Sequence, residues 1–128
     1  MRHSNRRRGD GRRRDHRGAA TAELALGIPL LVALTAGLVW MLAVGAAQVR
    51  VIDASREAAR AVARGDDVAA AEAVALRIAP ESARVRIEIG NSQVVVTTSA
   101  RVTGPGGLLA SLPGVTVSAD AVALVEAS

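Results

Sequence analysis

The sequence predicts an α+β protein with one long N-terminal helix, a second short helix and a small three-stranded antiparallel sheet. Three observations favour this fold class. Residues 24–49 form a run of 26 residues without a charge, which is long enough to cross a membrane as a helix. A segment with helical periodicity follows this run directly. Beyond residue 84, apolar and polar residues alternate with the period of two that is typical of strands.

The composition limits the kind of protein this can be. The chain has 128 residues, enough for one small domain, and half of them are hydrophobic. Trp40 is nevertheless the only aromatic residue, and the apolar content is mostly Ala and Val. Because cores usually rely on aromatic side chains for buried area, we expect a membrane segment and a small aliphatic core. The absence of Cys excludes disulfides and thiolate metal sites.

The basic charge lies in an N-terminal tail. Residues 1–17 hold eight Arg and two Asp, a net charge of +6, whereas the rest of the chain holds eight Arg and ten acidic residues, a net charge of −2. Such a polar, low-complexity stretch predicts a disordered basic leader over residues 1–18. Arginine clusters also bind nucleic acid through phosphate. No aromatic residue interleaves these arginines and a membrane segment follows at once, so we expect no nucleic-acid partner.

The transmembrane part of the first helix is predicted over residues 19–49. Arginines flank its near end, so the positive-inside rule places the N-terminus in the cytoplasm and the C-terminus outside, in a single-pass protein of the plasma (inner) membrane. Pro29 is expected to kink this helix, and Trp40 to lie at the membrane interface. A cleaved secretory signal with small residues at 44–46 is the alternative, but the apolar run exceeds the usual signal length of 7–15 residues.

Residues 50–65 are predicted to continue the same helix outside the membrane and to stop at Gly65. Glu57 and Arg60 stand three positions apart and can form an ion pair. One side of this segment carries a stripe of small and apolar residues, and the neighbouring side carries a polar stripe. The first stripe consists of Ile52, Ser55, Ala59 and Val62, and the second of Asp53, Glu57, Arg60 and Arg64.

Residues 66–128 are predicted to form a small α+β head domain. Asp66 or Asp67 can cap a helix over residues 68–79, which ends before Pro80. Gly90 and Asn91 mark a turn between the first two strands. We expect an antiparallel meander, covered on its apolar face by the helices at 50–64 and 67–79. The predicted strands are 84–89, 93–102 and 115–125.

Glu23 is out of place for a simple membrane anchor. Placing an ionisable residue inside or beside a membrane segment costs free energy, so such a residue is expected to have a function. Glu23 could serve only as an acid at a helix N-terminus, where the helix dipole favours it by about 0.3–1 kcal/mol. Its position, five residues after Gly18, offers another explanation.

Two stretches of this sequence resemble a known family. The first is Gly18-Ala19-Ala20-Thr21-Ala22-Glu23-Leu24-Ala25-Leu26 with Pro29, and the second is Asp53-Ala54-Ser55-Arg56-Glu57-Ala58-Ala59-Arg60. A glycine, small residues and a glutamate before an apolar helix resemble the start of a type IV prepilin. Residues 18–64 more specifically resemble the TadE-like family, the minor pilins or pseudopilins of tight-adherence (Flp-type) pilus assembly.

The resemblance implies a processing and assembly mechanism. A prepilin peptidase would cut between Gly18 and Ala19 and remove the basic leader. The Glu23 carboxylate would then neutralise the new amine of a neighbouring subunit and set the register of the assembly. The implied partners are this peptidase, other pilins or pseudopilins, the inner-membrane assembly platform and the lipid bilayer. The family motif on the exposed helix would comprise Asp53, Arg56, Glu57 and Arg60.

Enzymatic activity is not expected. Beyond the leader the chain has no His and no Cys, and its carboxylates lack metal-ligand spacing. Gly104-Pro105-Gly106-Gly107 lies between strands instead of leading into a helix, so it is not a phosphate loop. We therefore expect no catalytic residue, cofactor or metal. The alternative function is a membrane-anchored or secreted extracytoplasmic binding domain with no pilus role.

Overall fold

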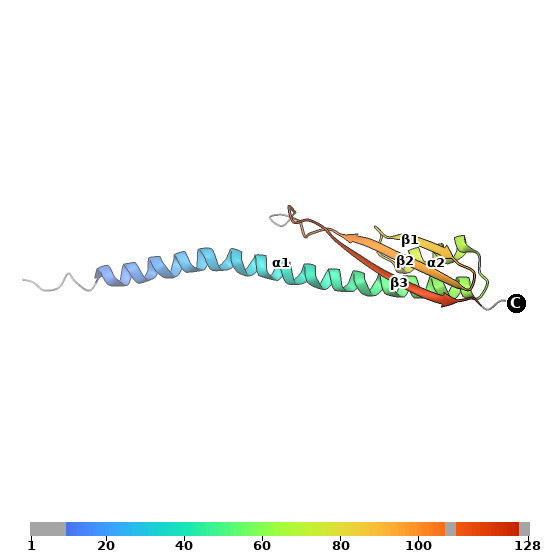
Figure 1. Ribbon diagram of the computed structural model, residues 1–128. Coiled ribbons are helices and arrows are strands. Elements are labelled where there is room, and N and C mark those ends of the chain that lie inside the picture. Colours follow the sequence, from blue (N-terminus) through green and yellow to red (C-terminus); the bar gives the residue numbers. More distant parts are fainter. Residues whose placement is uncertain (1–9, 107–109, 126–128) are drawn as a thin grey trace, which may run out of the picture. The chain divides into compact units, whose positions relative to one another are not determined.

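The computed structural model describes residues 10–106 and 110–125, with side chains from residue 15 onward. It has two helices followed by three strands, which confirms the predicted α+β class (Figure 1). The elements are α1 (Asp10–Ala63), α2 (Val68–Ile78), β1 (Arg84–Ile89), β2 (Gln93–Val102) and β3 (Val115–Leu124). The described residues fall into two compact units, divided between Gly37 and Leu38.

The helix α1 starts earlier than the sequence predicts. Its expected start was Ala19, whereas the observed start is Asp10, so residues 10–18 of the expected disordered leader are helical. Residues 1–9 of that leader lie outside the described residues. The physical reason is that Arg is a good helix former and that extending an existing helix needs no new nucleus. Pro29 lies inside α1 and does not end it.

Gly65 ends α1, as predicted, through a Schellman motif. Its φ of 94° is in the left-handed region, which a glycine adopts without steric cost. The Gly65 N–H donates to the Val62 carbonyl at 2.9 Å, and the Asp66 N–H donates to the Ala61 carbonyl at 3.0 Å. These two bonds satisfy carbonyls that the end of a helix otherwise leaves unpaired. The chain thereby reverses and enters α2, whose N-cap is Asp67.

The sheet is the predicted antiparallel meander, with strand order β1-β2-β3. The first two strands have the predicted bounds, and β3 ends at Leu124, one residue before the predicted end. Alternate residues of β2 are buried, as the period of two requires. The buried residues of β2 are Val94, Val96, Thr98 and Ala100.

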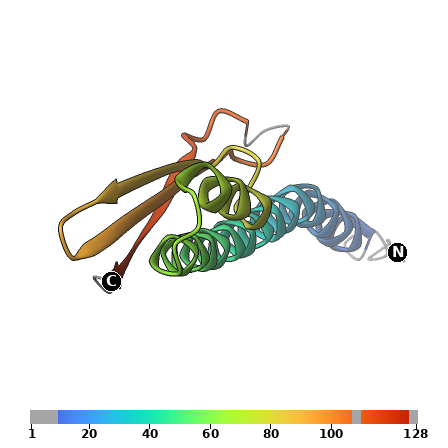
Figure 2. The same ribbon diagram turned by 90° about the vertical axis from the view of Figure 1, so that its right-hand side faces the viewer.

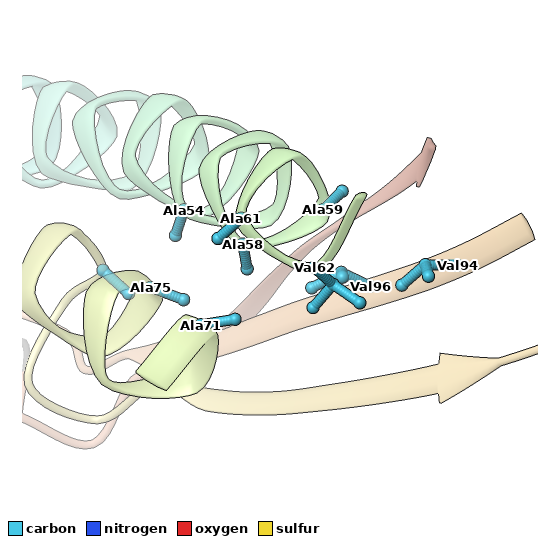
Figure 3. Packing of buried hydrophobic residues seen from close by; sticks show 10 residues of the cluster. Ala54, Ala58, Ala59, Ala61, Val62, Ala71, Ala75, Val94 and Val96 are labelled. Carbon is cyan, nitrogen blue, oxygen red and sulfur yellow. The ribbon is translucent and has the colours of Figure 1, made fainter. Parts of the chain in front are cut away.

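The second half of α1 and the whole of α2 cover one face of this sheet, as predicted (Figure 2). Alanines form most of the contact: Ala58 of α1 and Ala71 and Ala75 of α2 are fully buried. Figure 3 shows these alanines facing one another, with Val62 of α1 beside Val96 of β2. Small side chains let the backbones approach closely. The predicted stripe is therefore buried, except that Ile52 is only half-buried and the adjacent Val51 is fully buried.

Polar side chains of α1 also hold β3. The Ser55 hydroxyl is fully buried and lies 2.9 Å from the carbonyl oxygens of both Val51 and Ala119, so its proton serves two acceptors. About two turns earlier, the Gln48 side chain donates to the Ser118 carbonyl at 3.0 Å. The helix α1 thus donates to the carbonyls of two consecutive residues of β3.

Replacing Gly65 tests the Schellman motif. Gly65→Ala should lower the free energy of unfolding by about 1 kcal/mol, because a Cβ disfavours the left-handed conformation by roughly 1–2 kcal/mol. Gly65→Asn is the matched control and should cost less, since Asn tolerates this conformation. Chemical unfolding of the detergent-solubilised protein measures both. Equal stability of the Ala variant and the parent would contradict the assignment.

The hydroxyl of Thr98 gives a second test. It is buried, and its Oγ1 has no hydrogen-bond partner within the described part of the chain. A buried unsatisfied hydroxyl costs roughly 1–3 kcal/mol, so the nearly isosteric Thr98→Val should raise the free energy of unfolding by about 1 kcal/mol. Thr97→Val on the opposite face of β2 should change it much less. Destabilisation by Thr98→Val would show that the hydroxyl has a partner.

Candidate processing and assembly site

Gly18, Ala19 and Glu23 lie together on the exposed surface of α1. Ala19 and Glu23 are four positions apart, so their side chains share one face of the helix. A Cβ built on Gly18 meets no atom within 4 Å, so the backbone here is open on that side. The structure thus brings together the three residues that the sequence assigned to processing and register. This arrangement leaves the peptide bond after Gly18 accessible.

Glu23 is exposed at the boundary between a polar and an apolar surface. Among the residues with described side chains it forms no ion pair. The residues that follow are apolar and exposed, with Leu24 at 64% and Leu26 at 77% of full exposure. A carboxylate next to such a surface is available to pair with a cationic group of another molecule.

The apolar side chains of α1 remain exposed all around the helix between residues 24 and 42. A soluble monomer rarely leaves so large an apolar surface open. Within the described residues, α1 is the one helix that is long and apolar enough to cross a membrane. It can therefore be a membrane span, which agrees with membrane anchoring. The large exposed side chains of this stretch are Leu24, Leu26, Ile28, Leu30, Leu31, Val32, Leu34, Leu38, Val39, Met41 and Leu42.

Pro29 lies in the middle of this exposed apolar surface. Because proline has no N–H, the carbonyl of Ala25 loses its helical hydrogen bond. Lipid cannot replace that bond, whereas a polar group of a neighbouring helix can. Pro29 is thus a position where α1 keeps one backbone acceptor open.

Trp40 contacts the segment that follows β2. It is partly exposed, and its indole Nε1–H donates to the Thr103 carbonyl at 3.0 Å. Sequence reasoning missed this contact, because the two residues are 63 positions apart and no local pattern links them. The head therefore reaches back along α1 as far as Trp40, into the stretch that the sequence assigned to the membrane.

The predicted family motif on α1 forms part of a short chain of ion pairs. Glu57 lies 3.8 Å from Arg60, as predicted, and 3.7 Å from Arg64. Arg64 also lies 3.5 Å from Asp66, a link that crosses the end of α1 and that sequence reasoning missed. Asp53 and the cationic groups are exposed, so these pairs contribute little stability. They leave a polar face on α1 that points away from the sheet.

Arg56 lies on this same exposed side, so all four motif residues are available for contact with another molecule. The described residues contain no group of three or more His, Cys, Asp or Glu placed to hold a metal ion. The candidate sites are therefore two exposed surfaces of α1. One is the apolar surface that follows Glu23, and the other is the polar face that carries the four motif residues.

The α+β fold has a first helix that is long and apolar enough to span a membrane, with an exposed glutamate just before its apolar stretch, and this agrees with a membrane-anchored protein. Residues 18–60 match the family model of the TadE-like proteins, so the resemblance predicted from the sequence is confirmed for that segment. The match runs from the predicted processing site to Arg60 of the polar motif.

One curated relative comes from Mycobacterium tuberculosis (strain ATCC 25618 / H37Rv) and is named apoptosis inhibitor Rv3655c. It is 42% identical over 79 residues, which cover 62% of this chain and 57% of the relative. The chain therefore spans a little over half of the relative's length. No solved structure matches the chain.

Proposed function

We propose that this protein is a TadE-like minor pilin or pseudopilin of a tight-adherence type IV pilus or a related secretion system. A prepilin peptidase cleaves it after Gly18, and it then takes part in pilus assembly. The observation that carries the proposal is the family match over residues 18–60, which includes Gly18, Glu23 and the exposed apolar surface of α1.

The peptide bond after Gly18 is suited to cleavage. A protease binds an extended backbone, so the helix must open locally around Gly18. Glycine lowers the cost of that opening, because it disfavours the helix by about 1 kcal/mol relative to alanine. Nothing packs against Gly18 in the described structure, so opening breaks no tertiary contact there.

Cleavage changes the charge of the N-terminus. The leader carries a net charge of +6, which holds it on the cytoplasmic side and opposes extraction of the helix into a filament. After cleavage the charge that remains is the amine of Ala19. This single charge can be neutralised inside an assembly by one carboxylate.

Glu23 supplies that carboxylate. In the chain alone it is exposed beside apolar side chains and has no described ion-pair partner. When helices pack in an apolar assembly, pairing Glu23 of one subunit with the Ala19 amine of its neighbour fixes their axial register. Removing one member of such a buried pair costs roughly 3–5 kcal/mol.

The head and the polar face of α1 lie outside the membrane in this proposal. The protein is then single-pass, with a cytoplasmic N-terminus and an extracytoplasmic C-terminus, and part of it joins the pilus. Asp53, Arg56, Glu57 and Arg60 contact other pilins or the inner-membrane platform. Their charges are exposed and only loosely paired, which leaves them able to exchange partners.

The N-terminal mass of the protein from membranes tests cleavage. The parent chain should begin at Ala19, and Gly18→Arg should begin at Met1, because a large charged side chain blocks the peptidase site. Arg17→Ala, which changes the neighbouring residue, should still be cut. A parent chain that begins at Met1 would contradict the proposal, and a chain that begins near Ala47 would indicate a secreted domain.

Substitution of Glu23 tests its role in assembly separately from cleavage. Glu23→Gln should be cut after Gly18 as efficiently as the parent, yet its recovery in sheared pili should fall at least tenfold, because the buried amine loses its counter-charge. Glu57→Gln, which also removes one carboxylate but lies on the extramembrane face, should fall much less. Normal pilus incorporation of Glu23→Gln would exclude the register role.

A further inference from the structure

The sheet has a second face that no described element covers. The helices lie on one side of the three strands, and the other side is open (Figure 2). Side chains alternate between the two sides along each strand, and the register places residues of the open side next to one another. We call this open side the outer face. It comprises the even-numbered residues of β1 and β3 and the odd-numbered residues of β2.

One half of the outer face is basic. Arg84 and Arg86 stand two positions apart on β1, so their side chains leave the same side of the sheet, and both residues are exposed. Two hollows of about 440 and 480 Å³ share Arg84 and Ser99 in their linings, and no described acidic residue lines either of them. The ion pairs among the described side chains include neither arginine. This half therefore offers two guanidinium groups to a carboxylate of another molecule.

The other half of the outer face is apolar. Val95 of β2 pairs directly with Val122 of β3, and Leu124 is a diagonal neighbour of Val95 on the same side. Val122 is 61% and Leu124 is 74% exposed. The acidic residues of the face are Glu88, beside Val95, and Asp120, on the opposite edge strand from the two arginines. Adjacent exposed apolar residues beside a charged patch are typical of a surface that contacts a partner.

The exposed side of α2 carries groups that match this face. It consists of small and apolar residues with one carboxylate, which we call the α2 stripe. The Glu72 carboxylate belongs to none of the ion pairs among the described side chains. Arg77, the basic residue of α2, lies to one side of the stripe. The α2 stripe comprises Val68, Ala69, Glu72, Ala73 and Leu76, all of them exposed.

The order of groups along the stripe agrees with the order along the outer face. The chain reverses at Gly65 and again between α2 and β1, so α2 runs opposite to α1 and β1 runs parallel to it (Figure 1). Val68 lies four residues, or about 6 Å, before Glu72 along α2. Val95 lies two positions, or about 7 Å, beyond Arg86 along the strands, in the same direction. Two copies with parallel α1 helices can thus align Glu72 with Arg86 and Val68 with Val95.

The stripe and the outer face lie on opposite sides of the head, so they can meet only between two copies (Figure 2). A helix is about 10–12 Å wide with its side chains, and three strands span roughly 14 Å, so one helix fits on the face. A helix layer on a sheet face is a common way to bury its apolar side chains.

We infer that the outer face of one copy binds the α2 stripe of a second copy. The inference rests on the proposed function and adds to it a contact between heads. Because the two surfaces differ, each pair leaves one stripe and one outer face free, and the contact repeats in an open row, as a filament requires. The face covers roughly 400 Å², about half of what each partner buries in a stable complex. The contact therefore forms between copies that their α1 helices already hold together.

Disulfide cross-linking in membranes tests this contact, because the chain contains no Cys. Ala73→Cys places a thiol on the α2 stripe and Thr97→Cys places one on the outer face beside Arg86, and neither changes a charge. Mild oxidation of the two co-expressed variants should give at least tenfold more cross-linked dimer than either variant alone. Absence of this dimer would overturn the inference. So would an equal yield from Ala73→Cys alone, which would mean that like surfaces meet.

Charge reversal on the same cysteine variants tests the pairing of Glu72 with the arginines. Glu72→Arg in the Ala73→Cys copy should lower the yield of dimer at least tenfold. Adding Arg86→Glu to the Thr97→Cys copy should restore it, which also shows that the reversed chains fold. Glu81→Arg, the same charge change at an exposed position outside the stripe, should leave the yield unchanged. No loss with Glu72→Arg, or no recovery with Arg86→Glu, would contradict the pairing.

The N-terminal mass of the chains in the same membranes distinguishes failure of this contact from failure of the proposed function. Chains that begin at Ala19 but give no dimer would overturn the contact and leave the proposed function standing. Chains that begin at Met1 and give no dimer would overturn both. Chains that begin at Met1 and still give the dimer would support the contact and overturn the processing.

Discussion

The packing of alanines between α1 and α2 is the contact on which the head depends. Ala58, Ala71 and Ala75 are fully buried, and the sheet, α2 and the part of α1 after Trp40 contain no aromatic residue. Each alanine buries little area, so the interface gains stability from close backbone approach and from the continuous contact of two helices with one sheet. The valines of β2 fill the remaining space beneath them.

Because the core consists of small side chains, the end of α1 and the polar contacts of the head must be placed accurately. A core of small side chains tolerates little misplacement, so α1 must stop at one residue, and Gly65 provides that stop. Ser55 then fixes the position of β3 along the axis of α1 through its hydrogen bond to the Ala119 carbonyl. Far along the same helix, Trp40 fixes the segment after β2 through the Thr103 carbonyl. The second half of α1 thus serves as the support of the whole sheet.

The same helix presents a different surface before residue 38. There its apolar side chains are exposed on every side, and Glu23 lies just before them. A helix that is apolar all round suits lipid or a bundle of similar helices, whereas a helix that is apolar on one side suits a sheet. The proposed function uses both surfaces. The apolar first half of α1 anchors the subunit and packs in the assembly, and the second half supports the head, which contacts other proteins.

The sequence by itself determined the helices, the strands and the family resemblance of residues 18–60. The 26-residue charge-free run, the small-residue stripe and the alternation over β1 and β2 are local patterns, and each resulted in the predicted element. The residues from Gly18 to Glu23 likewise indicated the family that residues 18–60 match, because that signal lies in nearby residues. The start of α1 was missed because residues 10–18 extend a helix that others nucleate.

The tertiary structure alone decided which distant residues meet. Trp40 and Thr103, or Gln48 and Ser118, have no periodic or spacing signal that links them, because their contact follows from the path of the chain through α2 and the sheet. The burial of Val51 in place of Ile52 likewise depends on the angle at which α1 crosses the sheet. Local sequence fixes the period of a helix or strand. Packing against neighbouring elements fixes which of its sides is buried and which distant residues it contacts.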